Sequence, residues 1–469
     1  MGPFFLCEKT QVRRSKFGAM NILSFNRISL HVSCMLLLAS CVHENTSESI
    51  LTGVPMLGHV GMRHAVVWSQ ATDATAMKLT YWEQGQSMPV ALASYGKRDE
   101  YNCSVYQIDG LEPNVRYEGF IQTVDGRSLS DTIYWTTQEL WQYRTDPPQF
   151  TFATGSCAFI NEEQYDRPGT PYGGDYQTFK SIAREDFQGM LWLGDNVYLR
   201  EVDVSSKAGY RYRYEQMRRL PELQGLLSKG SHYAIWDDHD FGPDNSDGSW
   251  YHADWAKESF DSFWINPGNG LREAPELNVA YFQYADVDFF LLDNRTHRVN
   301  HRMGPEKRTL LGDVQMNWLL NALKNSRAPF KIIAVGGQML SDVAKYENFA
   351  QFPEERDQLL EALNELRIKG VVFLSGDRHC TELSQIELPN GRFVYDLTVS
   401  PLTSSSYDNT EEPNSHRVEG TVFGNRNYAL LDFSGPRKER VLKMSVKNSE
   451  GELQWTRSIE AANGYELKR

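Results

Sequence analysis

The chain has 469 residues, 41% of them hydrophobic, and a formal net charge of −13 at pH 7; it is long enough for two or three domains. Residues 1–40 carry five basic side chains and one acidic one, so the rest of the chain has a net charge of about −17. This balance excludes nonspecific nucleic-acid binding, which needs a basic surface. It suits a protein that holds several cations.

Residues 1–41 are predicted to be a targeting segment rather than part of the fold. Residues 20–40 contain a mostly apolar stretch at 28–38 that ends in small residues, as in a secretory signal. The sequence Leu-Ala-Ser-Cys at 38–41 resembles a bacterial lipobox, in which Cys41 would carry lipid and become the mature N-terminus. The alternative is an ordinary signal peptide with an unrelated cysteine. Residues 1–19 precede a plausible start at Met20 and could be non-native.

These features predict an exported protein of a bacterium, anchored by lipid in the periplasm or at the cell surface. No later stretch reaches the ~20 apolar residues that a membrane-spanning helix needs. Residues 42–50 are polar and are expected to form a linker. We expect a monomer.

Residues 51–140 alternate short apolar strands with turn residues and contain no helical pattern, which predicts a β-sandwich domain. The expected strands lie at 64–68, 77–82, 117–124 and 131–135. The segment from Leu111 to Tyr117 resembles the corner of fibronectin type III domains, where a tyrosine hydroxyl hydrogen-bonds to the preceding turn.

From about residue 148 to residue 465 strands alternate with helices, which is typical of α/β layering. This order predicts an αββα sandwich, in which two mixed sheets are flanked by helices. Expected helices lie at 175–187, 210–227, 255–264, 314–323 and 353–368, and expected strands at 330–335, 428–433, 441–446 and 453–459, with a hairpin turn at 389–391.

Four apolar strands in this region stop at side chains that can bind a metal. They are followed by Cys157, by Asp195 and Tyr198, by residues 237–240, and by Asp377 and His379. In α/β sheets, ligands bind beyond the carboxyl ends of the strands. Like charges ~4 Å apart, as in the run Asp-Asp-His-Asp at 237–240, repel by about 4 kcal/mol in a partly buried site, and a bound cation removes this repulsion.

Together these segments resemble the alkaline phosphatase D family, the PhoD-like metallophosphatases, which are relatives of the calcineurin-like phosphoesterases. The motifs are Ser-Cys at 156–157, Gly-Asp-x-x-Tyr at 194–198, Asp-Asp-His at 237–239 and Ser-Gly-Asp-x-His at 375–379. Further matches lie at 292–295, 311–319 and 398–402, so the resemblance spans nearly the whole mature chain.

Two departures from the family pattern suggest a branch with a different substrate. The third motif continues with Asp240 where the type members have glutamate. The chain also lacks the Asp-x-His that opens the site of calcineurin-like enzymes, and has Ser156-Cys157 in its place.

The resemblance implies Fe3+ held by Cys157, Asp195 and Tyr198, with Ca2+ nearby. Anionic sulfur and phenolate donors suit a trivalent ion, whereas carboxylates suit calcium. Asp195 is the predicted bridge between two ions. Alternatively, Cys157 could be an inert buried residue or form a disulfide with Cys380, and Tyr198 could be a core tyrosine.

Four more residues are predicted metal ligands. Asp237 and Asp238 are expected to supply oxygen donors. Asp377 and His379 follow a strand two residues apart, so their side chains should point the same way. The alternative for Asp377 is a capping role.

Three residues are predicted to act on the substrate. His239 could bind metal or protonate the leaving group, since its ordinary pKa is near neutrality. Asn196 could polarise a phosphoryl oxygen. Arg295, with Arg298, could contact phosphate; the alternative is that these arginines pair with the acidic clusters.

The resulting hypothesis is a metal-dependent phosphoric ester hydrolase, an alkaline phosphatase or phosphodiesterase. Its multinuclear site would activate water for in-line attack on phosphorus in a mono- or diester. Substrate choice is expected to lie in the loops 161–174 and 407–420. The alternative is a non-catalytic, metal-stabilised binding protein of the cell surface.

Overall fold

The structure is a computed structural model that describes residues 49–86 and 92–468. The predicted signal, Cys41 and most of the predicted linker therefore lie outside the described residues. The chain from Ser49 onward forms one unit. Within it, no described helix is both long and apolar enough to cross a bilayer.

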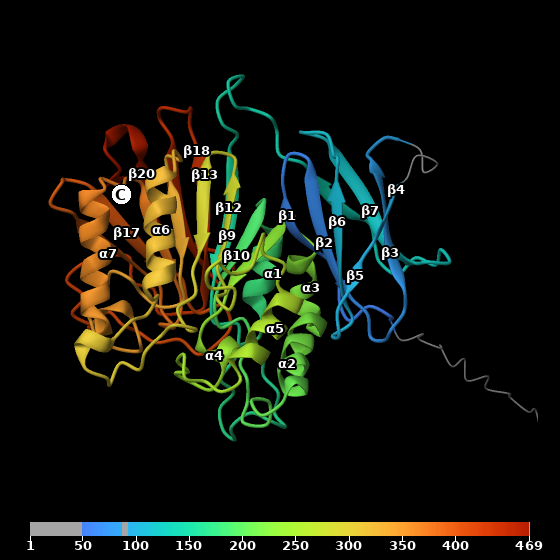
Figure 1. Ribbon diagram of the computed structural model, residues 1–469, viewed down its shortest axis with the longest axis horizontal. Helices are drawn as coiled ribbons and strands as arrows, with labels where there is room; N and C mark the ends of the chain where they lie inside the picture. Colours follow the sequence, from blue (N-terminus) through green and yellow to red (C-terminus); the bar gives the residue numbers. More distant parts are fainter. Residues whose placement is uncertain (1–48, 87–91, 469) are drawn as a thin grey trace, which may run out of the picture. The chain divides into compact units, whose positions relative to one another are not determined.

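The described residues form three sheets, and the largest has eleven strands. It runs through the middle of the ribbon in Figure 1. Its three central strands, which run parallel, are those that end at predicted site residues. The order across the sheet is β21 (Glu466–Lys468), β20 (Leu453–Glu460), β19 (Val441–Asn448), β18 (Asn427–Ser434), β9 (Phe150–Gly155), β10 (Gly189–Leu193), β11 (Ser231–Ile235), β1 (Met56–Val60), β2 (His64–Gln70), β6 (Cys103–Asp109) and β5 (Lys97–Arg98).

A second sheet of six strands packs against the first. Its four inner strands run parallel, and the fourth predicted site strand, β15, is among them. The order is β12 (Ala280–Tyr284), β13 (Val287–Leu291), β14 (Lys331–Ala334), β15 (Val371–Ser375), β17 (Phe393–Thr398) and β16 (Glu382–Glu387). The two sheets share one apolar core, in which Phe152 stacks on Phe289 with ring centroids 4.8 Å apart.

Helices cover the outer faces of both sheets. The helices α1 (Gln177–Arg184), α2 (Lys207–Arg219), α3 (Pro221–Leu227) and α5 (Ala253–Phe263) share a core with Trp192 and Trp236 of the larger sheet region. The helices α6 (Asp313–Asn325) and α7 (Pro353–Glu365) lie together on the other side of the two sheets, packed on Phe290 and Phe373 (Figure 1). The layers are therefore helices, sheet, sheet, helices.

The helix expected at 210–227 is two helices. Helix α2 ends at Arg219 and α3 begins at Pro221. Proline has no backbone N–H and pushes the residue before it out of the helical region, so Leu220 is extended and the chain turns there. A short helix, α4 (Asp238–Phe241), follows β11 directly and carries the third predicted motif.

The N-terminal part of the described chain adds β1, β2, β6 and β5 to the eleven-stranded sheet and forms the third sheet, so it is continuous with the α/β part. A four-stranded sheet of β4 (Leu92–Tyr95), β3 (Met77–Glu83), β7 (Arg116–Thr123) and β8 (Ile133–Thr136) shares a core with β1, β2 and β6. Strand β1 pairs in parallel with β11. The sequence did not predict this continuity, because a strand's partner is decided by the tertiary fold.

Tyr117 makes the hydrogen bond expected of the corner segment. Its hydroxyl accepts from the backbone N–H of Glu112 at 3.0 Å, and its ring stacks on Trp135. We expect Tyr117→Phe to lower the free energy of unfolding by about 1 kcal/mol in urea, because the backbone donor loses its partner. Tyr134→Phe is the control, since Tyr134 is 48% exposed on the same sheet. Equal stability of the two variants would contradict this role.

Candidate metal centre

Strands from both sheets deliver several of the predicted site residues to one place, whereas Asp237 and Asp377 belong to neither of the two groups of ligand atoms that meet there. The side-chain donors of Cys157, Asp195 and His379 lie within 4.8 Å of one another, and so do those of Asp195, Asp238 and His239. Cys157 and Asp195 follow strands of the larger sheet, whereas His379 follows β15 of the smaller one. Asp195 belongs to both groups, which is the arrangement that a bridging carboxylate requires.

Four of the predicted ligands have a left-handed backbone. The φ angles are 61° for Cys157, 50° for Asp195, 66° for Asp377 and 52° for His379. This conformation costs a non-glycine residue roughly 1–2 kcal/mol. Strain of this kind persists where the surrounding structure enforces it, and it gathers at functional sites.

Gly194, just before Asp195, has a φ of 89°, and a Cβ there would lie 2.7 Å from the Cβ of Asp237. Only glycine therefore lets the second and third motifs approach this closely.

Asp195 is buried among groups that a cation would stabilise. Its Oδ2 lies 3.5 Å from the Sγ of Cys157 and accepts a hydrogen bond from the Tyr198 hydroxyl at 3.1 Å. Burial, reinforced by the neighbouring carboxylates of Asp238 and Asp237, raises the pKa of Asp195 well above its usual range. A cation held here would reverse that effect.

Cys157 and Tyr198 are also fully buried. Burial, and then the charge of Asp195, raises the pKa of both side chains above their usual ranges. Such groups ionise in a protein interior when a metal replaces their proton. Among the described residues Cys157, Cys103 and Cys380 are free thiols, so the alternative of a Cys157–Cys380 disulfide is wrong.

His379 has the environment of a neutral imidazole. Its Nε2 lies 3.4 Å from the hydroxyl of Tyr198 and 3.2 Å from that of Ser404. Its Nδ1 lies 3.3 Å from the hydroxyl of Tyr172. Burial lowers the pKa of His379 to about 3. A neutral imidazole is the form that binds metal.

The three aspartates of the third motif have different surroundings. Asp240 accepts hydrogen bonds from the backbone N–H groups of Asn196, Val197 and Asp237, so it holds the turn after β10 in shape. Burial raises the pKa of Asp240 to about 7. Asp238 accepts from the N–H of Asn245 at 2.6 Å and lies in the second ligand group.

Several buried oxygens near these motifs have no hydrogen-bond donor among the described residues: Oδ2 of Asp237, Oδ2 of Asp377, Oδ1 of Asn196 and Oδ1 of Asn294. An unsatisfied buried polar atom costs about 1–3 kcal/mol, so each needs an explanation. Carboxylate and amide oxygens are ligands of hard cations such as Ca2+. The residues present therefore fit a centre with a soft, anionic half and a hard, oxygen-rich half.

Asn294 was not among the predicted site residues. It directly follows the 292–293 part of a quoted motif, and its Nδ2 donates to Asp237 at 2.9 Å. An amide three residues beyond the buried strand β13 was the sequence signal for it.

Asn196 has an orientation that differs from the prediction. Its Nδ2 donates to the carbonyl of Ile235 at 2.8 Å and to Asp240 at 3.1 Å. Both partners are acceptors, so the amide nitrogen is engaged and the oxygen is the unpartnered atom. The residue is therefore placed to offer an oxygen to a cation, and not an N–H to a phosphoryl oxygen.

Arg295 is engaged by acidic side chains, which is the alternative that the sequence left open. Its Nε donates to Asp237 at 2.6 Å, and its Nη1 donates to Glu347 at 2.5 Å and to the carbonyl of Ser246 at 3.0 Å. Arg298 donates to the same oxygen of Glu347 at 3.0 Å. Direct phosphate binding by Arg295 therefore does not match this geometry. Glu347 was not predicted from the sequence.

His239 lies at the edge of the centre. Its imidazole packs on the ring of Tyr198 with centroids 4.2 Å apart, and its side chain is 22% exposed. Its Nε2 lies 3.7 Å from Asp244. Among the residues of the two ligand groups it is the one that solvent reaches, so it can exchange protons with water.

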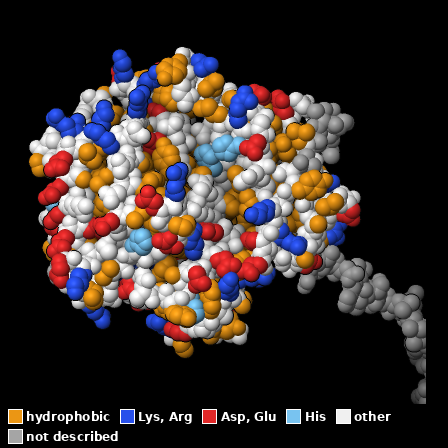
Figure 2. Space-filling view, viewed as in Figure 1, with side chains coloured by type: hydrophobic (Ala, Val, Ile, Leu, Met, Phe, Trp, Pro, Cys, Tyr) orange, Lys and Arg blue, Asp and Glu red, His pale blue; other side chains and the backbone are white. Residues whose placement is uncertain are grey.

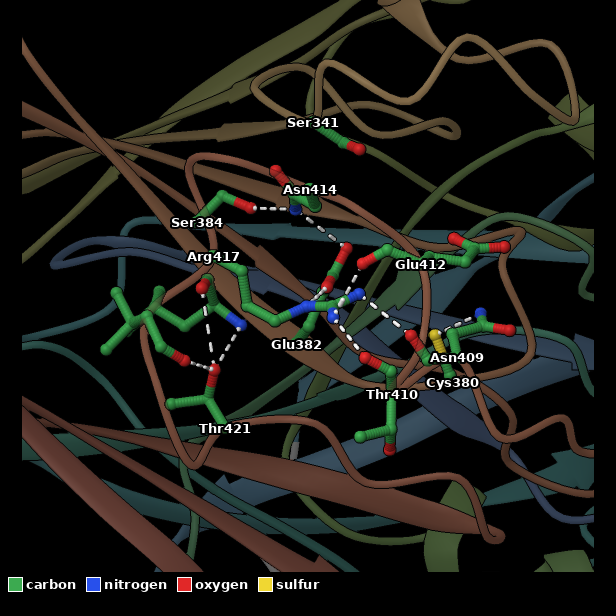
Figure 3. Close-up of polar contacts among 12 residues, drawn as sticks. Ser341, Cys380, Glu382, Ser384, Asn409, Thr410, Glu412, Asn414, Arg417 and Thr421 are labelled. Atoms are coloured by element: carbon green, nitrogen blue, oxygen red, sulfur yellow. Dashed lines mark hydrogen bonds and ion pairs between the residues drawn. The ribbon is translucent and has the colours of Figure 1, made fainter.

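Tyr407, in the loop 405–417, stacks in parallel on the imidazole of His379. Hydrogen bonds from one arginine hold this loop in place. Arg417 donates to Glu382 at 2.5 Å and to the carbonyls of Asn409, Thr410 and Glu412 (Figure 3). Cys380, which the alternative interpretation paired with Cys157 in a disulfide, instead accepts from Asn409 at 2.7 Å. This anchoring holds the loop against the centre.

A family model described as PhoD-like phosphatase matches residues 152–448. The chain belongs to this family. The PhoD-like chain is 23% identical over 329 residues to alkaline phosphatase D of Bacillus subtilis (strain 168). That match covers 60% of the chain but only 54% of the relative, so the chain spans about half the length of the relative it matches.

Two solved structures share its mixed α/β fold. A structure of PhoD superposes with a TM-score of 0.73 at 19% identity, covering 90% of this PhoD-like chain and 92% of the other. The purple acid phosphatase PPD1 of yellow lupin gives a TM-score of 0.63 at 12% identity, covering 87% and 74%. At these identities the likeness shows the fold.

Proposed function

We propose that this PhoD-like chain is a metal-dependent phosphoric ester hydrolase with a multinuclear centre. The observation that carries the proposal is the position of Asp195 in two overlapping groups of ligand atoms, each within 4.8 Å. Metal ions at such a centre supply an activated water and neutralise charge on the phosphoryl oxygens. The chain's own residues then have to hold the ions, orient the ester and supply a proton.

We assign the soft half to Cys157, Asp195, Tyr198 and His379, and Fe3+ to that half. The hard half would use oxygens of Asp237, Asp238 and Asp377, with the amide oxygens of Asn196 and Asn294, and would take Ca2+. The fit rests on donor chemistry, since thiolate and phenolate suit a trivalent ion and oxygens suit calcium. Arg295 and Glu347 are positioning residues in this proposal, because they fix Asp237.

His239 is the proposed proton donor to the leaving alkoxide. It is partly exposed, and Asp244 lies near its Nε2, so its imidazolium form has a nearby carboxylate. General acids of this type contribute about 10²–10⁴-fold to a rate.

We further propose the organisation predicted from the sequence. Residues 1–41 would direct export, Cys41 would carry the lipid anchor, and 42–50 would link it to a fibronectin type III-like sandwich at 51–140. The corner hydrogen bond of Tyr117 supports that likeness. On the face drawn in Figure 2, Lys and Arg side chains are interspersed with Asp and Glu, which suits a phosphate ester better than a nucleic acid as partner.

Metal removal tests the proposed function. The purified protein should hydrolyse 4-nitrophenyl phosphate, bis(4-nitrophenyl) phosphate or both. Dialysis against a chelator should lower kcat/KM by about 100-fold or more, and Fe3+ with Ca2+ should restore it. A protein that retains its metals, shown by elemental analysis, and cleaves neither ester would contradict the proposal and favour the surface binding protein.

A further inference from the structure

A cavity of about 570 Å³ opens beside the metal centre. We define the aromatic pocket by its apolar lining residues, Phe159, Tyr165, Tyr172, Tyr198, Leu199 and Val204. Its volume is in the range of small-molecule sites. It lies partly within the loop 161–174, which the sequence predicted to govern substrate choice.

The aromatic pocket shares side chains with the centre. Tyr198, in its wall, donates to Asp195 at 3.1 Å, and Tyr172 lies 3.3 Å from His379. His239 also lines the pocket. The wall is continuous, since the rings of Phe159 and Tyr172 are 4.9 Å apart and those of Phe159 and Tyr198 are 5.0 Å apart. An ester bound at the centre would therefore have one substituent directed along these rings.

The wall is held in place by Arg200, which is 7% exposed. Its guanidinium donates to Asp166 and to the carbonyl of Ile160, both at 2.8 Å, and also to the carbonyl of Tyr198. Its Cζ lies 4.0 Å from the ring centroid of Phe159. Hydrogen bonds and ring contacts thus fix the shape of the pocket wall, and the donors of Arg200 are engaged by protein acceptors.

The arginines of the lining are both paired with carboxylates. Arg167 pairs with Glu201 at 3.2 Å, and both are exposed at the rim. Asp244 adds a negative charge beside His239. Among the described lining residues, each arginine is therefore matched by a carboxylate, and Asp244 faces His239. A second phosphate on the substrate would find no unmatched arginine here, whereas an uncharged apolar group needs none.

We infer that the aromatic pocket takes an uncharged alkyl or aryl substituent of the phosphate ester, on the leaving-group side. The inference rests on the proposed function and specifies its substrate class. In the reaction, water oxygen bonds to phosphorus and the ester P–O bond breaks with its electron pair on the leaving oxygen. That oxygen takes a proton from His239, which lines the pocket. The attacking water releases its proton to solvent, from which the partly exposed His239 regains one. A monoester then becomes inorganic phosphate, and a diester a phosphate monoester, each with release of an apolar alcohol or phenol.

Binding of phosphonates, which cannot be hydrolysed, tests the pocket apart from the chemistry. Calorimetry would compare hexylphosphonate with methylphosphonate on the purified, metal-loaded protein. Each methylene removed from water adds roughly fourfold in affinity, so partial burial of five should make hexylphosphonate bind about 10- to 100-fold more tightly. The gain in affinity with chain length then measures contact with the apolar wall, and the binding of the phosphonate group itself measures contact with the centre.

A substitution in the lining tests whether the difference in affinity arises in the aromatic pocket. Thr170 lines the cavity and is exposed, so Thr170→Trp should narrow the pocket and lower the hexyl-to-methyl affinity ratio by about 10-fold. Thr132 is an exposed threonine before β8 and is not among the lining residues. Thr132→Trp is the matched control and should keep the wild-type ratio.

An affinity ratio near one in the wild-type protein would overturn the inference, as would a ratio that both tryptophan variants leave unchanged. Selective binding of hexylphosphonate without hydrolysis of any ester would support the pocket and contradict the proposed function. Hydrolysis of esters without this selectivity would support the proposed function and contradict the inference about the pocket. Failure of both phosphonates to bind would contradict both proposals.

Discussion

Asp195→Asn is expected to lower kcat/KM for phosphate esters by about 1,000-fold, which corresponds to about 4 kcal/mol of transition-state stabilisation. The reason is that Asp195 is shared by the two groups of ligand atoms, so the substitution weakens both halves of the centre at once. Steady-state kinetics with either nitrophenyl ester measures the loss. Elemental analysis of the same preparation shows how much metal remains.

The fold should survive this change. In the absence of metal, burial and then the neighbouring carboxylates raise the pKa of Asp195. A neutral asparagine avoids both costs, so the metal-free variant should be at least as resistant to urea as the metal-free parent. Asp288→Asn is the matched control, because Asp288 is also buried but is the second residue of β13, at the end of the strand far from Asn294, and accepts from Tyr281 and Gln283. Full activity of Asp195→Asn would contradict the metal mechanism.

Tyr198→Phe is expected to abolish the broad visible absorption band that a ferric phenolate gives, and to lower kcat/KM by about 100-fold. The hydroxyl of Tyr198 lies 3.1 Å from Asp195 and 3.4 Å from His379, so its removal takes one anionic donor from the soft half. Absorption spectra of the iron-loaded protein measure the band, and iron content is measured in parallel.

Tyr233→Phe controls for the loss of any buried tyrosine, since Tyr233 is fully buried in β11 but hydrogen-bonds to His59. That variant should keep the band. A band that persists in Tyr198→Phe would mean that the phenolate is not an iron ligand, and one that is missing from the iron-loaded parent would contradict the assignment of Fe3+.

The predicted site residues were found from the sequence by two signals. Periodicity identifies a buried strand locally, and the side chain just beyond it must lie at a sheet edge; the resemblance to the PhoD-like family then assigned the role of Cys157. The donor atoms of five predicted residues share the two ligand groups: Cys157, Asp195, Asp238, His239 and His379. The left-handed φ of three of them, and of Asp377, had no local signal, since neighbouring motifs impose it.

The roles of charged partners could not be predicted in the same way. Whether Arg295 faces a substrate or a carboxylate depends on Glu347, which is 52 residues away in the chain and lies in a different loop. Similarly, Asn196 could offer an amide hydrogen or an oxygen, and the positions of Ile235 and Asp240 decide this. A sequence gives the types of side chain available but not their orientation.

The sequence by itself determined the α/β layering, the strands that end at the candidate site and most helix limits, because these depend on local hydrophobic patterns, and its side-chain chemistry supplied the candidate metal ligands. Tertiary structure alone decided that three site strands lie in one sheet and the fourth in another, that β1 joins β11, and that Phe159, Tyr172 and Tyr198 enclose a pocket. Those features arise from pairings between distant segments, whose free energies come from packing that no local pattern records.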